Sequence, residues 1–334
     1  MTDTTKTSVT SGSAQRDLLA ATRWRWWEPL VWVAFFAAPL LLPQHAAIVS
    51  EIAIVGLFAV SLDLVLGYTG IVSLGHAAFL GFGAYTAALF AKHIHPDPTL
   101  GLLVGTAAAT LLGVVCSFSI MRGSDLTRLM VTLGTALILL ELANKWDNLT
   151  GGADGLQGVI LGPVLGRFEF DLMGQTAAWY SISVLFVCFV LMRRLVHSPL
   201  GATLMAVRDN ALRAKAIGIG VNARLGLIYT VSAAVAGASG ALLAQTTGFA
   251  SLDVFAMDRS ADVMLMLVMG GAGWLYGGIA GAVLFKLMYD VIASITPQYW
   301  TFWIGLFLVV LMLVGRDRLF KPWRWFGKRS GGAA

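Results

Sequence analysis

The sequence predicts an all-α polytopic membrane protein with about ten transmembrane helices. Of its 334 residues, 57% are hydrophobic and 12% are charged, which is about half the charged fraction of a soluble domain. Apolar runs close to the ~17–25 residues that cross a bilayer recur along the chain. The basic residues cluster between or beside these runs, as they do in membrane proteins, and need no nucleic-acid partner.

Ten apolar segments are the predicted transmembrane helices. They are 30–43, 48–66, 76–91, 99–121, 126–144, 178–194, 225–247, 260–274, 277–295 and 300–315. Because 30–43 and 260–274 are short for a span, eight or nine crossings are the alternatives. No signal-peptide cleavage pattern precedes the first segment, so we expect it to remain as an anchor. The chain thus divides into an N-terminal tail (1–28), a transmembrane domain (29–315) and a basic C-terminal tail (316–334).

The basic loops predict the orientation. If the N-terminus is cytoplasmic, the loops Arg122 to Arg128 and Arg193 to Arg224 and the C-terminal tail all fall on the cytoplasmic side, where positive charge is favoured. Both termini are therefore predicted to be cytoplasmic. The loops 145–177 and 247–258 then lie outside. The first of these is long and rich in Gly, Pro and Asp, so we expect an ordered external excursion that forms part of a substrate entrance.

The stretch 193–224, whose net charge of +5 equals that of the whole chain, contains a predicted surface helix over 199–217. Its predicted ends are a Ser-Pro start and a left-handed glycine stop: Ser198, Pro199, Gly218 and Gly220. The apolar positions Leu200, Leu204, Val207, Ala211 and Ala214 recur on one face. Asp209 and Arg213 are spaced as an i,i+4 pair on another face. Such a helix is expected to face a cytoplasmic partner; the alternative is a lipid-surface helix held by anionic headgroups.

Two glycine-rich stretches interrupt the bundle. One runs from Gly67 to Gly83 and the other from Gly270 to Gly281, and both are poor continuous helix. Paired interruptions at membrane depth are typical of backbone that lines a transport path. The alternative is close helix packing through small residues, as predicted for Gly237 to Gly240.

The ionisable residues in or beside the predicted spans should face protein or water, because exposure to lipid is costly. They are Glu51, Asp63, Glu141, Asp262, Lys286 and Asp290. Asp63 stands one turn before the first glycine break, where it either lines a polar path or caps nearby backbone amides. His76 is expected to be a hydrogen-bonding packing residue. The sequence contains no metal-ligand set, no paired-carboxylate site and no phosphate-binding G-x-x-x-x-G-K-[ST] loop, so ATP hydrolysis by that route is excluded.

Several motifs in order resemble the LivM-type permeases of branched-chain amino-acid ABC importers. They are Gly67-Tyr68-Thr69-Gly70 with Ser73-Leu74-Gly75-His76, then Leu149 to Leu156, Gly201 to Gly218, Ala236 to Leu242, and Gly270 to Ala282. The resemblance covers about residues 50–290. It implies a pore subunit in a bacterial inner membrane, surrounded by lipid and paired with a LivH-type permease. It also implies two cytoplasmic ATPase subunits that bind ATP and Mg, and an extracytoplasmic substrate-binding protein, with no cofactor in this chain.

The resemblance and the residue patterns described above together predict roles for residues. The cytoplasmic motif would be the coupling helix, with Leu204 and Val207 entering a groove on an ATPase and Arg208 and Asp209 fixing orientation at its rim. The whole predicted coupling set is Leu204, Val207, Arg208, Asp209, Asn210 and Arg213. The predicted translocation path is Asp63, Gly67, Gly70, Ser73, Gly75, His76, Glu141, Gly270, Gly271 and Gly273. The rival function is a self-contained secondary transporter coupled to protons through Asp63 and Glu141.

The sequence departs from the family pattern at several positions. Family members commonly have Asn in place of Asp63, often Gln in place of Ile71, and Glu in place of Leu137. They also have Pro before the aromatic that corresponds to Phe255. Glu141, one turn after Leu137, is a candidate substitute for that acid. The family type also serves urea, short amides and aromatic acids, so the substrate class stays open between these and branched-chain amino acids.

Overall fold

The protein is a bundle of helices in the computed structural model, which describes residues 25–314 except 122, 124, 172, 296 and 297. The long helices are α2 (Trp27–Leu41), α3 (Ala46–Thr69), α4 (Ala77–His93), α5 (Pro98–Ile120), α6 (Asp125–Lys145), α8 (Gln175–Val196), α11 (Val221–Thr247), α12 (Met257–Gly270), α13 (Leu275–Ile295) and α14 (Trp300–Val314). The shorter elements are η1 (Pro43–His45), α7 (Asp147–Thr150), η2 (Gly152–Asp154), α9 (Pro199–Asp209), α10 (Ala211–Ala216) and η3 (Leu252–Phe255). Each of the ten predicted segments is therefore helical.

The all-α membrane fold is confirmed, but the count of ten crossings is not. Among the described residues, 6 helices are long and apolar enough to cross a membrane. They are Pro43–Thr69, Pro98–Ile120, Leu126–Lys145, Gln175–Val196, Val221–Thr247 and Leu275–Ile295. Helix α2 is apolar but shorter, with 15 residues. The predicted basic tail beyond 315 and Arg122 lie outside the described residues.

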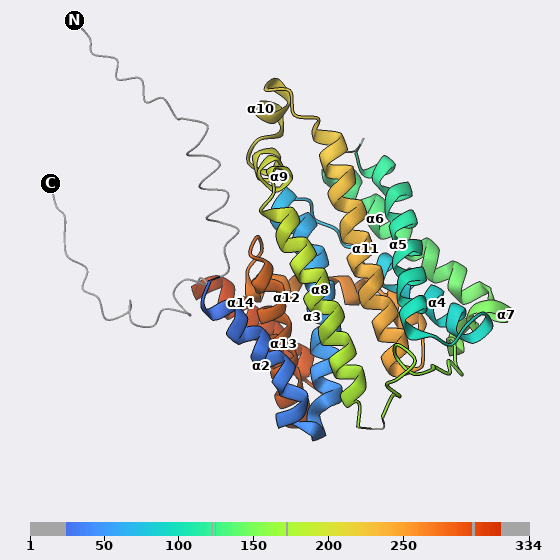
Figure 1. The fold of residues 1–334 in the computed structure, drawn as a ribbon. Helices are drawn as coiled ribbons and strands as arrows, with labels where there is room; N and C mark the ends of the chain where they lie inside the picture. The colour runs from blue at the N-terminus through green and yellow to red at the C-terminus, as the bar shows by residue number, and fades with distance from the viewer. Residues whose placement is uncertain (1–24, 122, 124, 172, 296–297, 315–334) are drawn as a thin grey trace, which may run out of the picture.

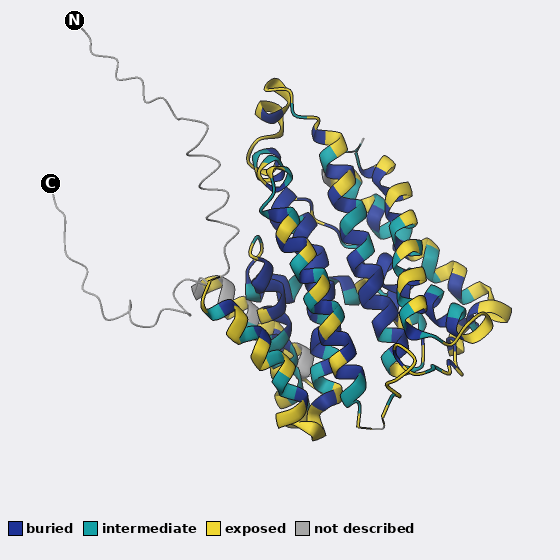
Figure 2. Cartoon of the chain, in the orientation of Figure 1, coloured by how far each residue is buried: buried dark blue, intermediate teal, exposed yellow. Residues whose placement is uncertain are grey.

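Helices α3 and α11 form the centre of the bundle. In the apolar 18-residue stretch of each of these two helices, 78% and 72% of the residues are buried, whereas in that of α6 only 17% are buried. Small residues bring α4 close to α11: a Cβ on Gly83 would overlap the backbone of Gly237, and one on Gly240 would overlap the carbonyl of Leu80. The predicted close packing at Gly237 to Gly240 is confirmed. Figure 2 shows the buried surface concentrated along these central helices.

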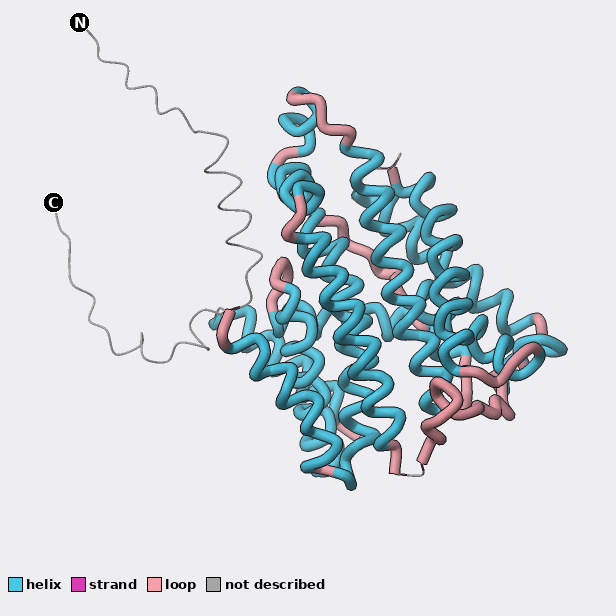
Figure 3. Tube along the Cα trace, viewed as in Figure 1, coloured by secondary structure: helices cyan, strands magenta, loops and turns pink. Residues whose placement is uncertain are grey.

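The two ends of the bundle differ. Figure 1 shows α9 and α10 together at one end, with α7 and the loop that follows it toward the other. Figure 3 shows loops at both ends and the loop between α3 and α4 crossing the middle of the bundle. The predicted long loop folds against the chain: Leu156 and Ala250 exchange backbone hydrogen bonds of 2.8 and 3.2 Å. Leu156 and Val159 also belong to the same buried cluster as Tyr85 and Phe255. We call this the η3 end; its extracytoplasmic location remains a prediction.

Helix α2 is fixed to α8 by an ion pair inside the protein. Arg193 donates to the Glu28 carboxylate, and the two side chains are 9% and 6% exposed. The ring of Trp32 packs against Phe189 of α8 at 5.1 Å between centroids. Arg193, the first residue of the basic stretch 193–224, is therefore a buried structural residue.

Candidate functional site

The predicted surface helix is two helices. Its start is confirmed, since Ser198 Oγ accepts a hydrogen bond from the Leu200 N–H at 3.2 Å and Pro199 follows it. The single helix over 199–217 is wrong, because the chain is extended at Asn210 (φ −161°, ψ 100°). The Asn210 Oδ1 accepts from the Arg213 N–H at 2.9 Å and caps α10. Asn favours such a cap over a position inside a helix, because its side chain bonds nearby backbone amides. The predicted Asp209–Arg213 pair is not formed, since the break removes the i,i+4 geometry.

The end of this segment follows the prediction in part. Gly218 has φ +88°, the left-handed conformation that a glycine stop requires, whereas Gly220 has φ −71°. Gly220 instead stands directly before α11.

The apolar stripe of α9 faces inward. Leu204 is 0% and Val207 is 5% exposed. Leu204 belongs to the same buried cluster as Leu64 and Tyr68 of α3, and Val207 belongs to the cluster that contains Val65. Both side chains are already covered by their own chain, so the prediction that they enter a partner's groove is wrong. The periodicity correctly identified a buried face but not what covers it.

A different set of apolar side chains faces outward from this element. Met205 is 45%, Leu212 is 79% and Ile217 is 75% exposed. The predicted coupling residues Asp209, Asn210 and Arg213 are also exposed. We call Met205, Leu212 and Ile217 the outer face of α9–α10 and take these exposed large apolar side chains as a candidate contact surface.

Arg208 links α9 to both glycine breaks. Its Nη1 donates to the carbonyl of Gly67, in the last turn of α3. The Asp63 Oδ1 accepts from the Gly273 N–H at 2.7 Å, and a Cβ on Gly273 would lie 3.2 Å from Arg208 Nη1. A Cβ on Gly67 would overlap both the Asp63 carboxylate and the Gly273 nitrogen. We call Asp63, Gly67, Arg208 and Gly273 the junction.

The junction decides between two interpretations of Asp63. The residue is 0% exposed, and its carboxylate caps a backbone amide of the other break. Its second oxygen, Oδ2, has no hydrogen-bond partner among the described residues. The geometry therefore supports capping, and it places a carboxylate and a guanidinium beside the two places where the helical backbone stops.

The backbone at both breaks requires glycine. Helix α3 ends at Gly70 with φ +75°, and α12 ends before Gly271 (φ +106°) and Gly273 (φ +82°). A residue with a Cβ is strained in such conformations. The predicted interruptions of helix are confirmed at these two positions.

The rest of the predicted path is not gathered at the junction. Gly75 lies against α6, where a Cβ would overlap the Thr132 carbonyl, and Gly270 lies against the Gly277 carbonyl. His76 is fully buried, with Nε2 2.9 Å from Ser61 Oγ, which is the packing role expected for it. Ser73 is also buried.

Glu141 lies apart from these residues. It is exposed on α6 and pairs with Lys145 of the same helix at 3.3 Å. Leu137, on the same face, is 54% exposed. The structure therefore does not bring Glu141 to Asp63.

Sequence reasoning missed a cavity at the η3 end, with a volume of about 410 Å³. Its charged lining consists of Glu51, Asp253, Asp258, Arg259, Asp262 and Lys286. Lys286 Nζ lies 2.8 Å from Glu51 Oε1 and 3.7 Å from Asp290 Oδ1. The i,i+4 spacings of 258 with 262 and of 286 with 290 were the available signal, because each places two charges on one helix face. We call this the charged cavity.

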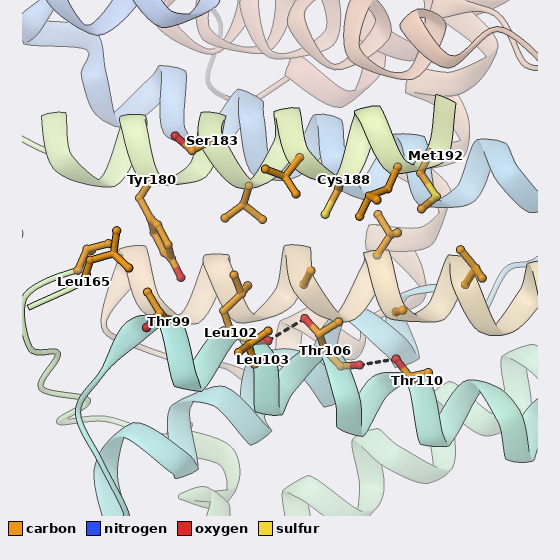
Figure 4. Close-up of a pocket in the computed structure, with 18 of the residues that line it drawn as sticks. Thr99, Leu102, Leu103, Thr106, Thr110, Leu165, Tyr180, Ser183, Cys188 and Met192 are labelled. Atoms are coloured by element: carbon orange, nitrogen blue, oxygen red, sulfur yellow. Dashed lines mark hydrogen bonds between the residues drawn. The ribbon is translucent and has the colours of Figure 1, made fainter. Parts of the chain in front are cut away.

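A second, larger space lies between α5, α8 and α11, with a volume of about 560 Å³ (Figure 4). No charged side chain lines it. Its hydroxyls are used locally: Thr106 donates to the Leu102 carbonyl at 2.7 Å and Thr110 to the Thr106 carbonyl at 2.6 Å (Figure 4). This groove offers a polar solute no charged partner.

The chain was compared with known proteins. Residues 45–314 match the family described as the permease component of the branched-chain amino acid transport system. The chain is 26% identical over 288 residues to the high-affinity branched-chain amino acid transport system permease protein LivM of Escherichia coli, covering 80% of this chain and 67% of the relative.

Two further LivM proteins are similar. That of Salmonella typhimurium is 28% identical over 293 residues, with the same coverage of 80% and 67%. A probable branched-chain amino acid transport permease protein of Methanocaldococcus jannaschii is 23% identical over 272 residues, 70% of this chain and 77% of the relative. No solved structure matches.

Proposed function

The chain belongs to the permease components of branched-chain amino acid transport systems, and we propose that it is the pore subunit of an ABC importer driven by separate ATPase subunits. Its proposed partners are a LivH-type permease, two cytoplasmic ATPases that bind ATP and Mg, and an extracytoplasmic binding protein. Its proposed substrate is a branched-chain amino acid or a related small amino acid or amide. The proposed location is a bacterial inner membrane, with both termini cytoplasmic.

The observation that carries this proposal is the bond from Arg208 to Gly67. The outer face of α9–α10 offers an ATPase an exposed apolar surface, and Arg208 joins the same element to the place where α3 ends. A shift of α9 would pull on the last turn of α3, directly before the glycine break that begins at Gly70. Movement of an ATPase can thus reach the membrane interior through a short chain of contacts.

Substitutions on the outer face test the docking step. Leu212→Asp and Ile217→Asp should lower co-purification of the ATPase at least about tenfold, because central apolar contacts dominate interface affinity. Ile160→Asp is a matched control: Ile160 is exposed to the same 79% as Leu212 but lies at the η3 end. Normal assembly of both outer-face variants would contradict the assigned docking surface. Leu204→Asp is not a suitable probe, because it would disrupt packing within the chain.

Cysteine labelling tests the orientation. If the loop after α7 is extracytoplasmic, Ala153→Cys should react with a membrane-impermeant thiol reagent from outside. Ala333→Cys should not. Reversed labelling would overturn the topology and with it the cytoplasmic location of α9–α10.

The rival proton-coupled transporter receives no support from the site. It requires Asp63 and Glu141 to serve one path, whereas Asp63 is bonded to Gly273 and Glu141 pairs with Lys145 on an exposed face. Uptake by this chain alone under a proton gradient would nevertheless restore it.

A further inference from the structure

We propose that the charged cavity binds a zwitterionic amino acid with an apolar side chain within this chain, an inference that rests on the proposed import function. The cavity lies between α3, α12 and α13 at the η3 end, opposite α9–α10. Its volume of about 410 Å³ is in the range of small-molecule sites. A solute delivered to the η3 end would meet it before reaching the junction.

The cavity offers donors for a carboxylate. Lys286 carries three N–H donors; Glu51 accepts one at 2.8 Å, Asp290 Oδ1 lies 3.7 Å from Nζ, and the Tyr289 ring centroid lies 4.7 Å from it. Arg259 uses Nε and Nη2 for Asp253, at 2.9 and 2.5 Å, so part of its five-donor fork remains. Both cations are held in place by existing ion pairs yet keep hydrogen-bonding capacity.

The cavity is also lined by more carboxylates than cationic side chains. Four carboxylates line it (Glu51, Asp253, Asp258 and Asp262) against two cationic side chains. No ion pair joins Asp258 or Asp262 to another described residue. The two acids stand one turn apart on α12, so an ammonium group placed there would receive two carboxylates at once.

The floor of the cavity is apolar. Phe58 of α3, Val263 and Met266 of α12, and Phe285 of α13 line it and are each buried. A ligand with an ammonium and a carboxylate at the rim would place its side chain on this floor. The cavity combines both charge signs with an apolar floor. The groove in Figure 4 has no charged lining, and at the junction the Asp63 carboxylate already accepts the Gly273 N–H.

The test measures binding of radiolabelled L-leucine to the purified permease–ATPase complex without the binding protein. Unlabelled L-leucine should compete, whereas N-acetyl-L-leucine and 3-methylbutylamine should compete at least about tenfold less well, because each lacks one of the two charges. Glycine should also compete poorly, because it leaves the floor unfilled. Equal competition by all four, or no saturable binding, would overturn the site.

Variants then locate the binding. Asp262→Asn should weaken L-leucine binding about tenfold or more, and Asp262→Glu should retain more of it. Glu141→Gln, which removes a carboxylate outside the cavity, should bind as wild type. Unchanged binding by Asp262→Asn, or an equal loss in Glu141→Gln, would contradict the assignment. If Asp262→Asn does not assemble, the competition series on the unaltered complex still decides.

Failure of this site is distinguishable from failure of the importer proposal. If the complex assembles and imports substrate but the cavity variants and ligand series show no effect, only the binding site is wrong. If the ATPase does not associate, the proposed function itself fails.

Discussion

Two charged regions lie near opposite ends of α3, and their carboxylates differ in burial and in hydrogen-bond partner. Asp63, near the end of the helix, is fully buried and bonded to the Gly273 amide. Glu51 lies 12 residues earlier, about 18 Å along the axis, and its side chain is 44% exposed in an ion pair with Lys286. The Asp63 carboxylate is therefore already used by a backbone amide of the same chain. The Glu51 carboxylate is partly exposed and is held by an ion pair between side chains, so a ligand can compete for it.

This difference separates two tasks. A buried carboxylate that caps a backbone amide fixes geometry, and breaking that contact leaves a buried donor unpaired, which is costly. Partly exposed ion pairs contribute little to stability, so replacing them with ligand contacts costs little free energy. We therefore assign transmission of movement to the junction and recognition to the charged cavity.

The largest expected effect is at the junction glycines. Gly273→Val combines a left-handed φ of +82° with a Cβ 3.2 Å from Arg208 Nη1, and should abolish uptake and lower stability by about 2 kcal/mol. Gly134→Val is the control, since a Cβ at Gly134 meets nothing within 4 Å. Uptake assays with an immunoblot for membrane insertion check both. Wild-type uptake by Gly273→Val would show that the junction needs no close approach.

The next effect separates the hydrogen bond of Asp63 from its charge. Asp63→Ala leaves the Gly273 N–H without its acceptor and should destabilise the protein by about 1–3 kcal/mol. Asp63→Asn keeps an acceptor oxygen at nearly the same place, so most stability and transport should remain. Thermal unfolding of the purified protein measures the difference. If Asn is as damaging as Ala, the charge beside Arg208 matters more than the cap.

A smaller stability effect is expected in the cavity. Glu51→Gln removes the partner of Lys286 and should change the free energy of unfolding by less than about 1 kcal/mol, because the pair is partly exposed. Uptake at low substrate concentration should nevertheless fall, as the rim loses charge. A stability loss as large as that of Asp63→Ala would erase the contrast between the two regions.

The smallest effect is expected at an acid that belongs to neither region. Asp97 caps α5, and its hydrogen bonds to Thr99 hold the pKa of the carboxyl below its ordinary value of 3.8. An acid with a lowered folded-state pKa stabilises above its unfolded pKa and loses that contribution as pH falls through the folded value. In Asp97→Ala the melting temperature should therefore fall slightly less as pH is lowered into the acid range than it does in the wild type. Uptake at neutral pH should not change. Altered neutral-pH uptake would mean that the η3 end is more tightly coupled than we infer.

The sequence predicted local features well. Apolar length located all ten helices to within a few residues, and the Ser198–Pro199 start followed from capping chemistry alone. Asn210 caps α10, but the helical periodicity on both sides concealed this break.

Contacts distant in sequence were not predictable from one chain. The Asp63–Gly273 bond joins residues 210 apart, and the Lys286–Glu51 pair joins residues 235 apart. Periodicity also cannot say whether an apolar face meets its own protein or a partner, which is why Leu204 was assigned to the wrong contact. Glu141 failed similarly: helical spacing placed it beside Leu137, but both face outward on α6.

The most direct test of the account is the coupling of ATP hydrolysis to transport in Arg208→Met, measured in the reconstituted complex. Arg213→Met is the matched control, because Arg213 lies on the same exposed element and its side chain makes no bond to the breaks. We expect Arg208→Met to assemble normally with the ATPase but to lose most substrate-stimulated hydrolysis and uptake, since the link to Gly67 is gone. Arg213→Met should remain coupled. Wild-type coupling in Arg208→Met would contradict the role of the junction in transmitting ATPase movement to the membrane helices.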